Sequence, residues 1–294
     1  MSRRARIGLF STLTGAGSRA LVTAVAEAWH GGTLGDVDIA FLFCNRGPGE
    51  SALTDASAVA LEARLGVPVV RVSAARFRTA ERRAARERDA AGDAEALWAW
   101  RDAYYATFAD LLPATDLDLL LGDMWIWGRR QCAARRGVNL HPALPTGPLG
   151  KMWFDVIWDL IAAGAAGSGV MLHRVTPEVD RGPVVTYCRY GLRGPETDSL
   201  WSALPECLTE RTALIASQRA LKREATHPLF GALRARGLAR ELPLMLETVR
   251  SVAGGRLRLE GDSVLDAAGV VLDAGLDLTA QVERAVAGAV PSAC

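Results

Sequence analysis

The sequence predicts an α/β fold with a mostly parallel central sheet covered by helices. Short apolar segments with strand character alternate with segments of helical periodicity along the first two-thirds of the chain. Strands separated by helices are typical of parallel sheets, because two parallel neighbours need a long crossover between them. The run Asp-Leu-Leu-Leu at residues 118–121 lacks polar alternation. It therefore indicates a strand that is buried on both faces.

Seven strands are predicted in chain order: residues 6–10, 37–43, 69–72, 117–121, 138–140, 169–175 and 183–190. Helices are expected near residues 19–30 and 52–65. A long charged helical stretch, residues 74–110, stands between the third and fourth strands and is rich in Arg and Ala. Charge runs of this kind are usually solvated helix faces. Its aromatic residues are expected to pack against the sheet rather than to stack on a ligand: Trp98, Trp100, Tyr104 and Tyr105.

The last third of the chain differs in character. We predict a division into a main domain, residues 1–193, and a C-terminal extension, residues 194–294, to which no chemistry can be assigned. Helices are expected in the extension at residues 200–222, 227–237, 241–253 and 278–286. Two short strands, residues 256–260 and 264–272, should form a hairpin with Gly261 and Asp262 at its turn.

Composition excludes several classes of protein. The 294 residues can bury a large core, and 34 Lys and Arg against 33 Asp and Glu argue against a dedicated nucleic-acid surface. No apolar stretch reaches the roughly 18 residues of a membrane-spanning helix, so no membrane association is expected. The apolar residues 7–13 are too few for a signal peptide. Five dispersed cysteines without a CxxC pair indicate reduced thiols, no metal and a cytoplasmic location.

Polar residues follow two of the predicted strands. Asn139 and His141 lie in the segment Val-Asn-Leu-His-Pro at residues 138–142, and Asp180 precedes Gly182 and Pro183. An amide, an imidazole and a carboxylate at the carboxyl ends of sheet strands can form an acid/base site. Asn139 and His141 are two residues apart, so a strand places both side chains on one face. The alternative for such a segment alone is a strand-end cap followed by a core histidine.

The turn after the first strand, residues 11–18, is a second candidate site. Gly15, Ala16, Gly17 and Ser18 stand where a helix begins, and backbone N–H groups at a helix start can bind phosphate or carboxylate. The alternative is a tight turn without a ligand. A dinucleotide site would place an acidic residue after the second strand, where this chain has Asn45 and Arg46. NAD is therefore not expected.

These segments, in this order, resemble the folate-dependent formyltransferase family, and they are most similar to phosphoribosylglycinamide (glycinamide ribonucleotide) formyltransferase. The resemblance covers residues 6–200 and rests on residues 138–142, on His-Arg-Val at 173–175, on Asp-Arg-Gly-Pro at 180–183, and on the turn. It implies a Rossmann-like formyltransferase fold and 10-formyltetrahydrofolate as the co-substrate. It also implies catalytic roles for Asn139, His141 and Asp180.

Formyl transfer to an amine forms a tetrahedral intermediate with negative charge on the former formyl oxygen. Asn139 would donate to that oxygen, His141 would transfer protons, and Asp180 would keep His141 charged. The resemblance implies a folate-binding role for Met124, Trp125, Ile126, Trp127, Val138 and Asp180. It implies that Gly15, Ala16, Gly17 and Ser18 hold the substrate phosphate.

The acceptor stays open, because this chain departs from the family pattern at the acceptor side. Asp123 and Trp125 replace an aromatic residue and an arginine of the family, and residues 143–153 form a differently built loop containing Trp153. Glycinamide ribonucleotide, an amino sugar, an amino acid or another phosphorylated amine are the candidates. The other function classes are a 10-formyltetrahydrofolate deformylase and a non-catalytic protein that binds folate or another ligand. The assembly state is also open, with a homodimer among the options.

Overall fold

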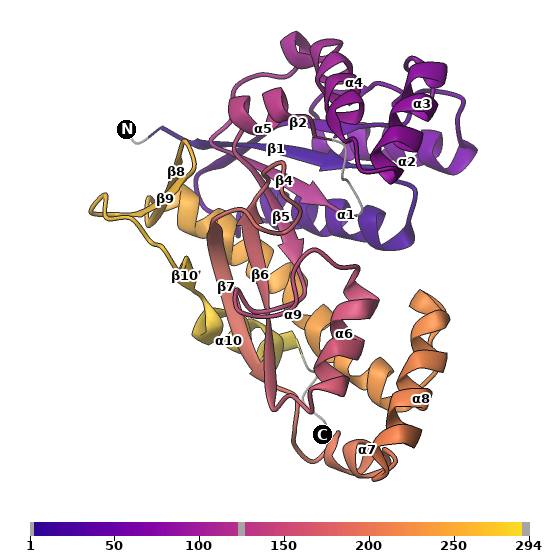
Figure 1. Cartoon of the computed structure of the whole chain (residues 1–294). Helices are drawn as coiled ribbons and strands as arrows, with labels where there is room; N and C mark the ends of the chain where they lie inside the picture. The colour runs from indigo at the N-terminus through magenta and orange to yellow at the C-terminus, as the bar shows by residue number, and fades with distance from the viewer. Residues whose placement is uncertain (1–2, 123–126, 290–294) are drawn as a thin grey trace. The chain divides into compact units, whose positions relative to one another are not determined.

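The computed structural model describes residues 3–122 and 127–289 (Figure 1). Contacts divide the chain into two units. Unit 1 comprises Met1–Asn139, Arg174–Gly182 and Val249–Leu272, and unit 2 comprises Leu140–His173, Pro183–Thr248 and Asp273–Cys294. The predicted α/β fold is confirmed, with a mostly parallel sheet, flanking helices and a C-terminal extension of helices and a hairpin. Segments of the extension belong to both units, and the predicted boundary at residue 193 stays a prediction.

Unit 1 is built on parallel strands in the order β5-β4-β1-β2-β3. Their bounds are β1 (Ala5–Ser11), β2 (Val37–Cys44), β3 (Val69–Arg71), β4 (Leu117–Leu121) and β5 (Gly137–His141). The bounds of β4 are those that its apolar run predicts. All five of its residues are buried, as expected for a strand covered on both faces.

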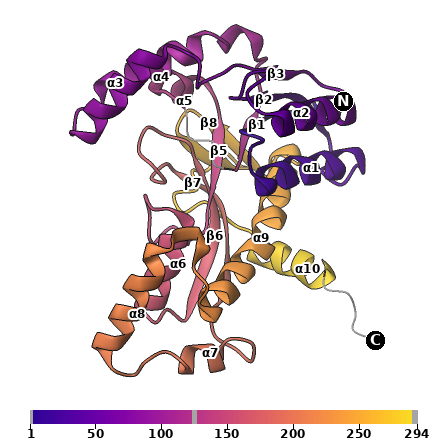
Figure 2. The ribbon, with the colours of Figure 1, turned by 90° about the vertical axis from the view of Figure 1, so that its right-hand side faces the viewer.

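Helices cover both faces of this sheet. Figure 2 shows α1 (Ala16–His30) and α2 (Ala52–Leu65) on one side of β1, and α3 (Thr79–Ala90), α4 (Glu95–Ala106) and α5 (Arg129–Ala134) on the other. The predicted stretch 74–110 is not one helix. It breaks at Gly92, whose φ of 95° lies in the left-handed region that glycine tolerates. A short 3-10 helix, Ala109–Leu111, follows α4.

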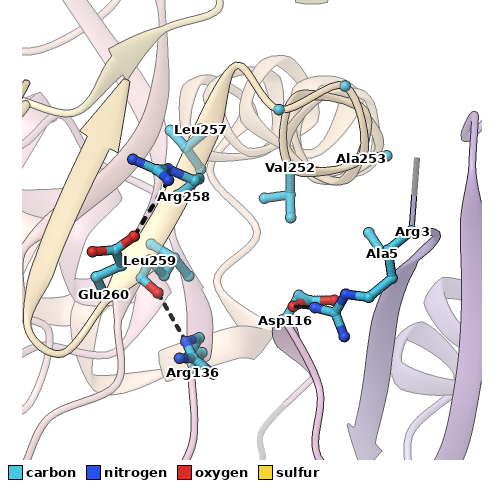
Figure 3. Close-up of a pocket in the computed structure, with 12 residues that line it drawn as sticks. Arg3, Ala5, Asp116, Arg136, Val252, Ala253, Leu257, Arg258, Leu259 and Glu260 are labelled. Carbon is cyan, nitrogen blue, oxygen red and sulfur yellow. Dashed lines mark hydrogen bonds and ion pairs between the residues drawn. The ribbon is translucent and has the colours of Figure 1, made fainter. Parts of the chain in front are cut away.

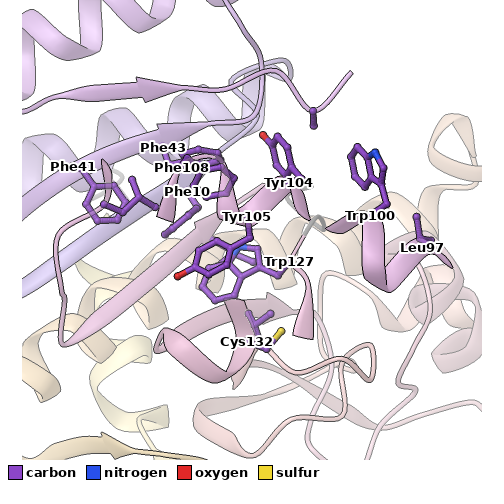
Figure 4. Packing of buried hydrophobic residues seen from close by; sticks show 14 of the residues in the cluster. Phe10, Phe41, Phe43, Leu97, Trp100, Tyr104, Tyr105, Phe108, Trp127 and Cys132 are labelled. Atoms are coloured by element: carbon purple, nitrogen blue, oxygen red, sulfur yellow. The ribbon is translucent and has the colours of Figure 1, made fainter. Parts of the chain in front are cut away.

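Three of the four aromatic residues predicted to pack against the sheet, Trp100, Tyr104 and Tyr105 of α4, belong to the buried core (Figure 4). Trp98 lies outside this cluster: it is half-buried, and its ring faces the guanidinium groups of Arg101 and Arg129. Phe43 of β2 stacks on Phe108 with ring centroids 4.2 Å apart, and Phe10 of β1 contacts the ring of Trp127 edge-on at 5.1 Å. Trp100 and Tyr104 stack in parallel. Each buried aromatic side chain removes a large apolar area from water, at about 25 cal/mol per Å². This cluster therefore stabilises unit 1 substantially.

A buried ion pair lies beside these rings. Asp118 of β4 accepts hydrogen bonds from Arg135 Nε at 2.7 Å and from Thr115 Oγ1 at 2.8 Å. The Arg135 guanidinium covers the ring of Phe41 at 5.1 Å. Asp118 is fully buried, so its charge depends on these partners. The carboxylate also fills the space beside Gly8 that a Cβ would need.

Unit 2 contributes the strands β10-β7-β6 to the eight-stranded sheet. Its strands are β6 (Gly167–Arg174), β7 (Val184–Gly191) and β10 (Leu276–Asp277). β6 and β7 pair antiparallel, whereas β10 pairs with β7 in parallel. Trp158 is fully buried and stacks on Phe230, with centroids 5.1 Å apart, so it is a core residue of this unit. Trp153 packs at the margin of the same cluster.

The helices of unit 2 differ from the prediction at two prolines. The predicted helix 200–222 is wrong, because α7 (Asp198–Ser202) ends before Pro205 and α8 (Leu208–Ala220) begins after it. The two helices predicted at 227–237 and 241–253 are instead one, α9 (Pro228–Ala253), with Pro243 inside. An ion pair between Arg234 and Glu241 spans two turns of this helix just before the proline. The contact of Arg240 with Glu283, which is distant in the chain, is a tertiary contact that helps to offset the hydrogen bond lost at the proline.

The predicted hairpin and last helix are present, but the second hairpin strand ends at Asp266 rather than at residue 272, and β10 is not among the predicted strands. The hairpin forms from β8 (Leu257–Glu260) and β9 (Ser263–Asp266), and the chain's last described helix is α10 (Thr279–Ala289). A short 3-10 helix, Lys222–Glu224, follows α8. In the part of the chain that the structure describes, no helix has the length and apolar character needed to cross a bilayer. The same residues contain no cluster of three potential metal ligands.

Candidate functional site

The strand order of unit 1 reverses between β1 and β4, which makes this place a topological switch point. From β1 the chain continues outward to β2 and β3 and then returns to β4 on the other side of β1. In open α/β sheets, ligands bind outside the carboxyl ends of the strands at such a point. Gly122, which follows β4, lies against Ser18 here: a Cβ on Gly122 would stand 2.6 Å from that of Ser18. The end of β4 and the start of α1 are therefore in contact.

The predicted anion-binding turn lies at this switch point. Gly15 is the N-cap of α1, and no side chain caps the helix. The first helical hydrogen bond runs from Arg19 N to Gly15 O at 3.2 Å, so the N–H groups of Ala16, Gly17 and Ser18 precede the helical ladder. The first turn of α1 carries no acidic residue. The partial positive charge of the helix start is therefore directed at solvent, where an anion can bind.

Two residues that the sequence does not single out shape this turn. Leu13 is fully buried and has φ of 52°, a left-handed conformation that is rare for a bulky residue. Such backbone costs on the order of 1–3 kcal/mol and is concentrated at functional sites. Arg19 donates from Nη1 to the carbonyls of Leu13 at 3.1 Å and Thr14 at 2.8 Å. A positive φ at Leu13 has no local sequence signal.

Asn45 lies beside this turn, at the carboxyl end of the neighbouring strand β2. Cys44, the last residue of β2, pairs in register with Ser11 of β1, so Asn45 follows at the level of the turn. Asn45 is 6% exposed, and its Oδ1 accepts no hydrogen bond from the described residues. A buried unsatisfied acceptor costs about 1–3 kcal/mol. Asn45 is therefore a candidate ligand contact. The sequence alone does not indicate this role, because there Asn45 serves only as an argument against NAD.

Asn139 and His141 lie on β5 at alternate positions, as predicted. Asn139 is half-buried, and His141 is 3% exposed. The His141 Nε2 stands 2.7 Å from the carbonyl oxygen of Pro148. A carbonyl can only accept, so Nε2 must carry a proton. This hydrogen bond therefore fixes the neutral ring as the tautomer with its proton on Nε2, and Nδ1 is then an acceptor.

The loop that supplies the Pro148 carbonyl is part of the differently built segment, residues 143–153. It contains a tight turn in which Gly147 N donates to Leu144 O at 2.8 Å. Pro145 and Thr146 occupy the centre of that turn, and proline suits the first central position because its φ is preset. This loop therefore holds the acceptor that fixes the tautomer of His141.

Asp180 adopts a left-handed backbone conformation, with φ of 56° and 7% exposure. It occupies the third position of a turn in which Arg181 N donates to Glu178 O at 3.4 Å. That position of a type II turn demands a positive φ, which Asp accepts better than most residues. The backbone of Gly182 approaches the carbonyl of Arg174 so closely that no Cβ would fit. The loop that carries Asp180 therefore packs directly against the last residue of β6.

This loop is anchored to β5 within unit 1. Val175 N donates to Gly137 O at 2.8 Å, and Arg174 Nη1 donates to the same carbonyl at 3.1 Å. Gly137 begins the strand that carries Asn139, so the segment containing Asp180 is tied to that strand at its start. His141 belongs to unit 2, and its approach to Asp180 stays a prediction.

The predicted folate-binding residues are only partly described. Met124, Trp125 and Ile126, together with Asp123, lie outside the described residues. Val138 is fully buried in β5 and pairs with Leu119 of β4. Trp127 lies in the aromatic core against Phe10 rather than at the surface, and its contact with a folate stays a prediction.

No protein-family model and no curated protein matches this sequence. Among solved structures, the chain is similar to the phosphoribosylglycinamide formyltransferase of Coxiella burnetii, with TM-score 0.59, 18% identity and coverage of 93% of this chain and 99% of that one. It is similar to glycinamide ribonucleotide transformylase 1 of Symbiobacterium toebii, with TM-score 0.53, 20% identity and coverage of 90% and 94%. The formyltetrahydrofolate deformylase of Burkholderia mallei gives TM-score 0.53, 18% identity and coverage of 90% and 70%. These similarities show the fold that the chain shares with all three.

Proposed function

We propose that this chain, which has the fold of the glycinamide ribonucleotide formyltransferases and formyltetrahydrofolate deformylases, transfers a formyl group from 10-formyltetrahydrofolate to an amine of a small molecule. The observation that carries the proposal is the buried imidazole of His141 at the end of β5. Its Nε2 proton is held by the Pro148 carbonyl, and Asn139 precedes it on the same face of the strand. The proposal places the reaction in the cytoplasm.

The chemistry requires one bond to form and one to break. The amine nitrogen attacks the formyl carbon, the formyl oxygen becomes negative, and the bond from that carbon to folate N10 then breaks. The amine loses one proton and N10 gains one. His141 serves this exchange at Nδ1, the Asn139 amide donates to the negative oxygen, and Asp180 stabilises the imidazolium.

The acceptor in this proposal carries an anionic group. The start of α1 has N–H groups without a capping side chain and no acidic residue in its first turn, which favours a phosphate or carboxylate at residues 15–18. Asn45 Oδ1 adds an acceptor at the same edge, suited to a hydroxyl or amine of that molecule. A phosphorylated amine fits these features best. Folate contacts from residues 124–127, Val138 and Asp180 are part of the same proposal.

The experiment supplies the purified chain with 10-formyltetrahydrofolate and a panel of amines, including glycinamide ribonucleotide and phosphorylated amino sugars, and measures tetrahydrofolate formed. We expect turnover with one of the phosphorylated amines. His141→Asn should lower the rate about 10²- to 10⁴-fold, the usual contribution of an acid/base group. The matched control is His30→Asn, a histidine at the end of α1 that should be dispensable. A near wild-type rate for His141→Asn would overturn the assignment.

A deformylase is the second candidate, favoured by the similarity to the Burkholderia mallei deformylase. Here water replaces the amine, and formate leaves. Incubation with 10-formyltetrahydrofolate alone separates the two functions, because rapid formate release without an amine identifies the hydrolase. A third possibility, a non-catalytic protein, is decided by titration calorimetry: absence of folate binding would support it and exclude both enzymes.

A further inference from the structure

A pocket lies at the amino ends of the unit 1 strands (Figure 3). It has a volume of about 520 Å³, within the roughly 300–1,000 Å³ of small-molecule sites. Ala5 begins β1, Asp116 directly precedes β4 and Arg136 directly precedes β5, so the pocket adjoins the amino ends of these strands. The anion-binding turn and Asn139 lie toward the carboxyl ends. The pocket is thus separate from the candidate catalytic site.

One wall of this pocket is cationic. Arg136 donates from Nε to Leu259 O at 2.8 Å and from Nη1 to Thr115 O at 3.3 Å. Both partners are neutral carbonyls, and none of the carboxylates in the described part of the chain pairs with Arg136. The other charged groups of the pocket are already matched, Arg3 with Asp116 and Arg258 with Glu260. Arg136 therefore carries a positive charge that a ligand carboxylate can neutralise.

The facing wall is the C-terminal end of α9. Gly255, with φ of 67°, closes the helix: its N–H donates to Val252 O at 3.1 Å, and Arg256 N donates to Ser251 O at 2.9 Å. These hydrogen bonds satisfy the carbonyls of the last turn. The carbonyls of Ala253 and Gly254 come after them and form the end of the helix. The C-terminus of a helix carries a partial negative charge. It therefore attracts an ammonium group.

An apolar surface joins the two walls. Val252 is half-buried, and in Figure 3 its side chain points from α9 into the pocket. Ala5 and Leu259 also line the pocket and keep a small exposed area, whereas Leu257 is fully buried behind them. Aliphatic side chains of this kind match an aliphatic ligand group and offer it no hydrogen bond.

We propose that this pocket binds a zwitterionic amino acid with an aliphatic side chain. Its carboxylate lies against Arg136, its ammonium group against the end of α9, and its side chain on Val252 and Leu259. A dianion such as a phosphate fits less well, because the helix end repels its second charge and the two remaining arginines are already paired. This site is independent of the formyl chemistry proposed above.

The test is titration calorimetry of the full chain with L-leucine, followed by isocaproate, which lacks the ammonium group, and isoamylamine, which lacks the carboxylate. We expect leucine to bind and each analogue to bind about tenfold more weakly, since each loses one charge-assisted contact. Equal affinity for isocaproate would replace the zwitterion with a simple anion. No binding of leucine, isoleucine, valine or methionine up to about 10 mM would overturn the proposal.

Two variants locate the binding. Arg136→Gln removes the unmatched charge and should weaken leucine binding about tenfold. Val252→Trp fills the pocket from the helix, keeps every charge and should abolish binding, so it remains informative if Arg136→Gln disturbs the hairpin through Leu259. Arg64→Gln on α2 is the matched control, because it removes one arginine charge outside the pocket, where the guanidinium pairs with the exposed Glu27. Unchanged affinity in Val252→Trp would show that leucine binds elsewhere.

Discussion

Leu13 provides a direct test of the turn before α1, because two opposing effects of known size meet at one residue. Its side chain is fully buried, and truncation of a buried leucine costs about 2–5 kcal/mol. Its φ of 52° adds a left-handed backbone cost of about 1–2 kcal/mol, which only glycine escapes. Leu13→Ala loses the packing and keeps the strain. Leu13→Gly loses the packing and releases the strain.

We therefore expect Leu13→Gly to be more stable than Leu13→Ala by about 1 kcal/mol, although both are less stable than the wild type. The matched control is Leu9 on β1, equally buried but in ordinary strand backbone. There the glycine variant should be less stable than the alanine variant by about 0.5–1 kcal/mol. The order of the two variants is thus opposite at the two positions.

Urea unfolding of the four variants, monitored by circular dichroism, measures both differences. If Leu13→Gly is less stable than Leu13→Ala, as at Leu9, the left-handed turn does not exist in solution. The geometry of the anion site would then be refuted with it. If the order inverts as expected, Leu13→Gly should also weaken inorganic phosphate binding, because the strained residue positions the N–H groups at the start of α1.

Three further predictions concern other residues. Backbone N–H groups at the start of α8 lower the pKa of the exposed Cys207, whereas burial raises the pKa of Cys132 to about 11. At pH 8, iodoacetamide should therefore modify Cys207 far faster than Cys132, as measured by peptide mapping. Comparable rates at the two cysteines would contradict the structure. In ¹⁵N NMR, neutral His141 should carry its proton on Nε2, and a proton on Nδ1 would show that the Pro148 contact is absent. Arg135→Met should lower the free energy of unfolding by about 3–5 kcal/mol in chemical denaturation, because it leaves Asp118 buried and unpaired. The double variant that also carries Asp118→Leu should recover much of that stability. A small loss for Arg135→Met alone would mean that water reaches the carboxylate.

Local signals account for much of what the sequence predicts correctly. The apolar run of β4 and the Gly-Asp turn between β8 and β9 depend on neighbouring residues alone, and both elements form where the pattern places them. The two prolines show the limit of such signals. Pro205 separates α7 from α8, whereas Pro243 lies inside α9. The flanking sequence does not distinguish them, because the contacts that hold α9 together come from residues distant in the chain.

The sequence by itself determined the α/β class, the alternation of Asn139 and His141 along one strand, and the turn at the start of α1. Each of these follows from the period of a strand or from residue types at a helix boundary. Only the tertiary structure decided that Pro148 holds the proton on His141 Nε2, that Leu13 and Asp180 are left-handed, and that Arg136 faces the end of α9 across a pocket. The pocket arises because segments distant in the chain fold against one another, and the contacts at His141, Leu13 and Asp180 depend on a backbone conformation that residue types alone do not encode.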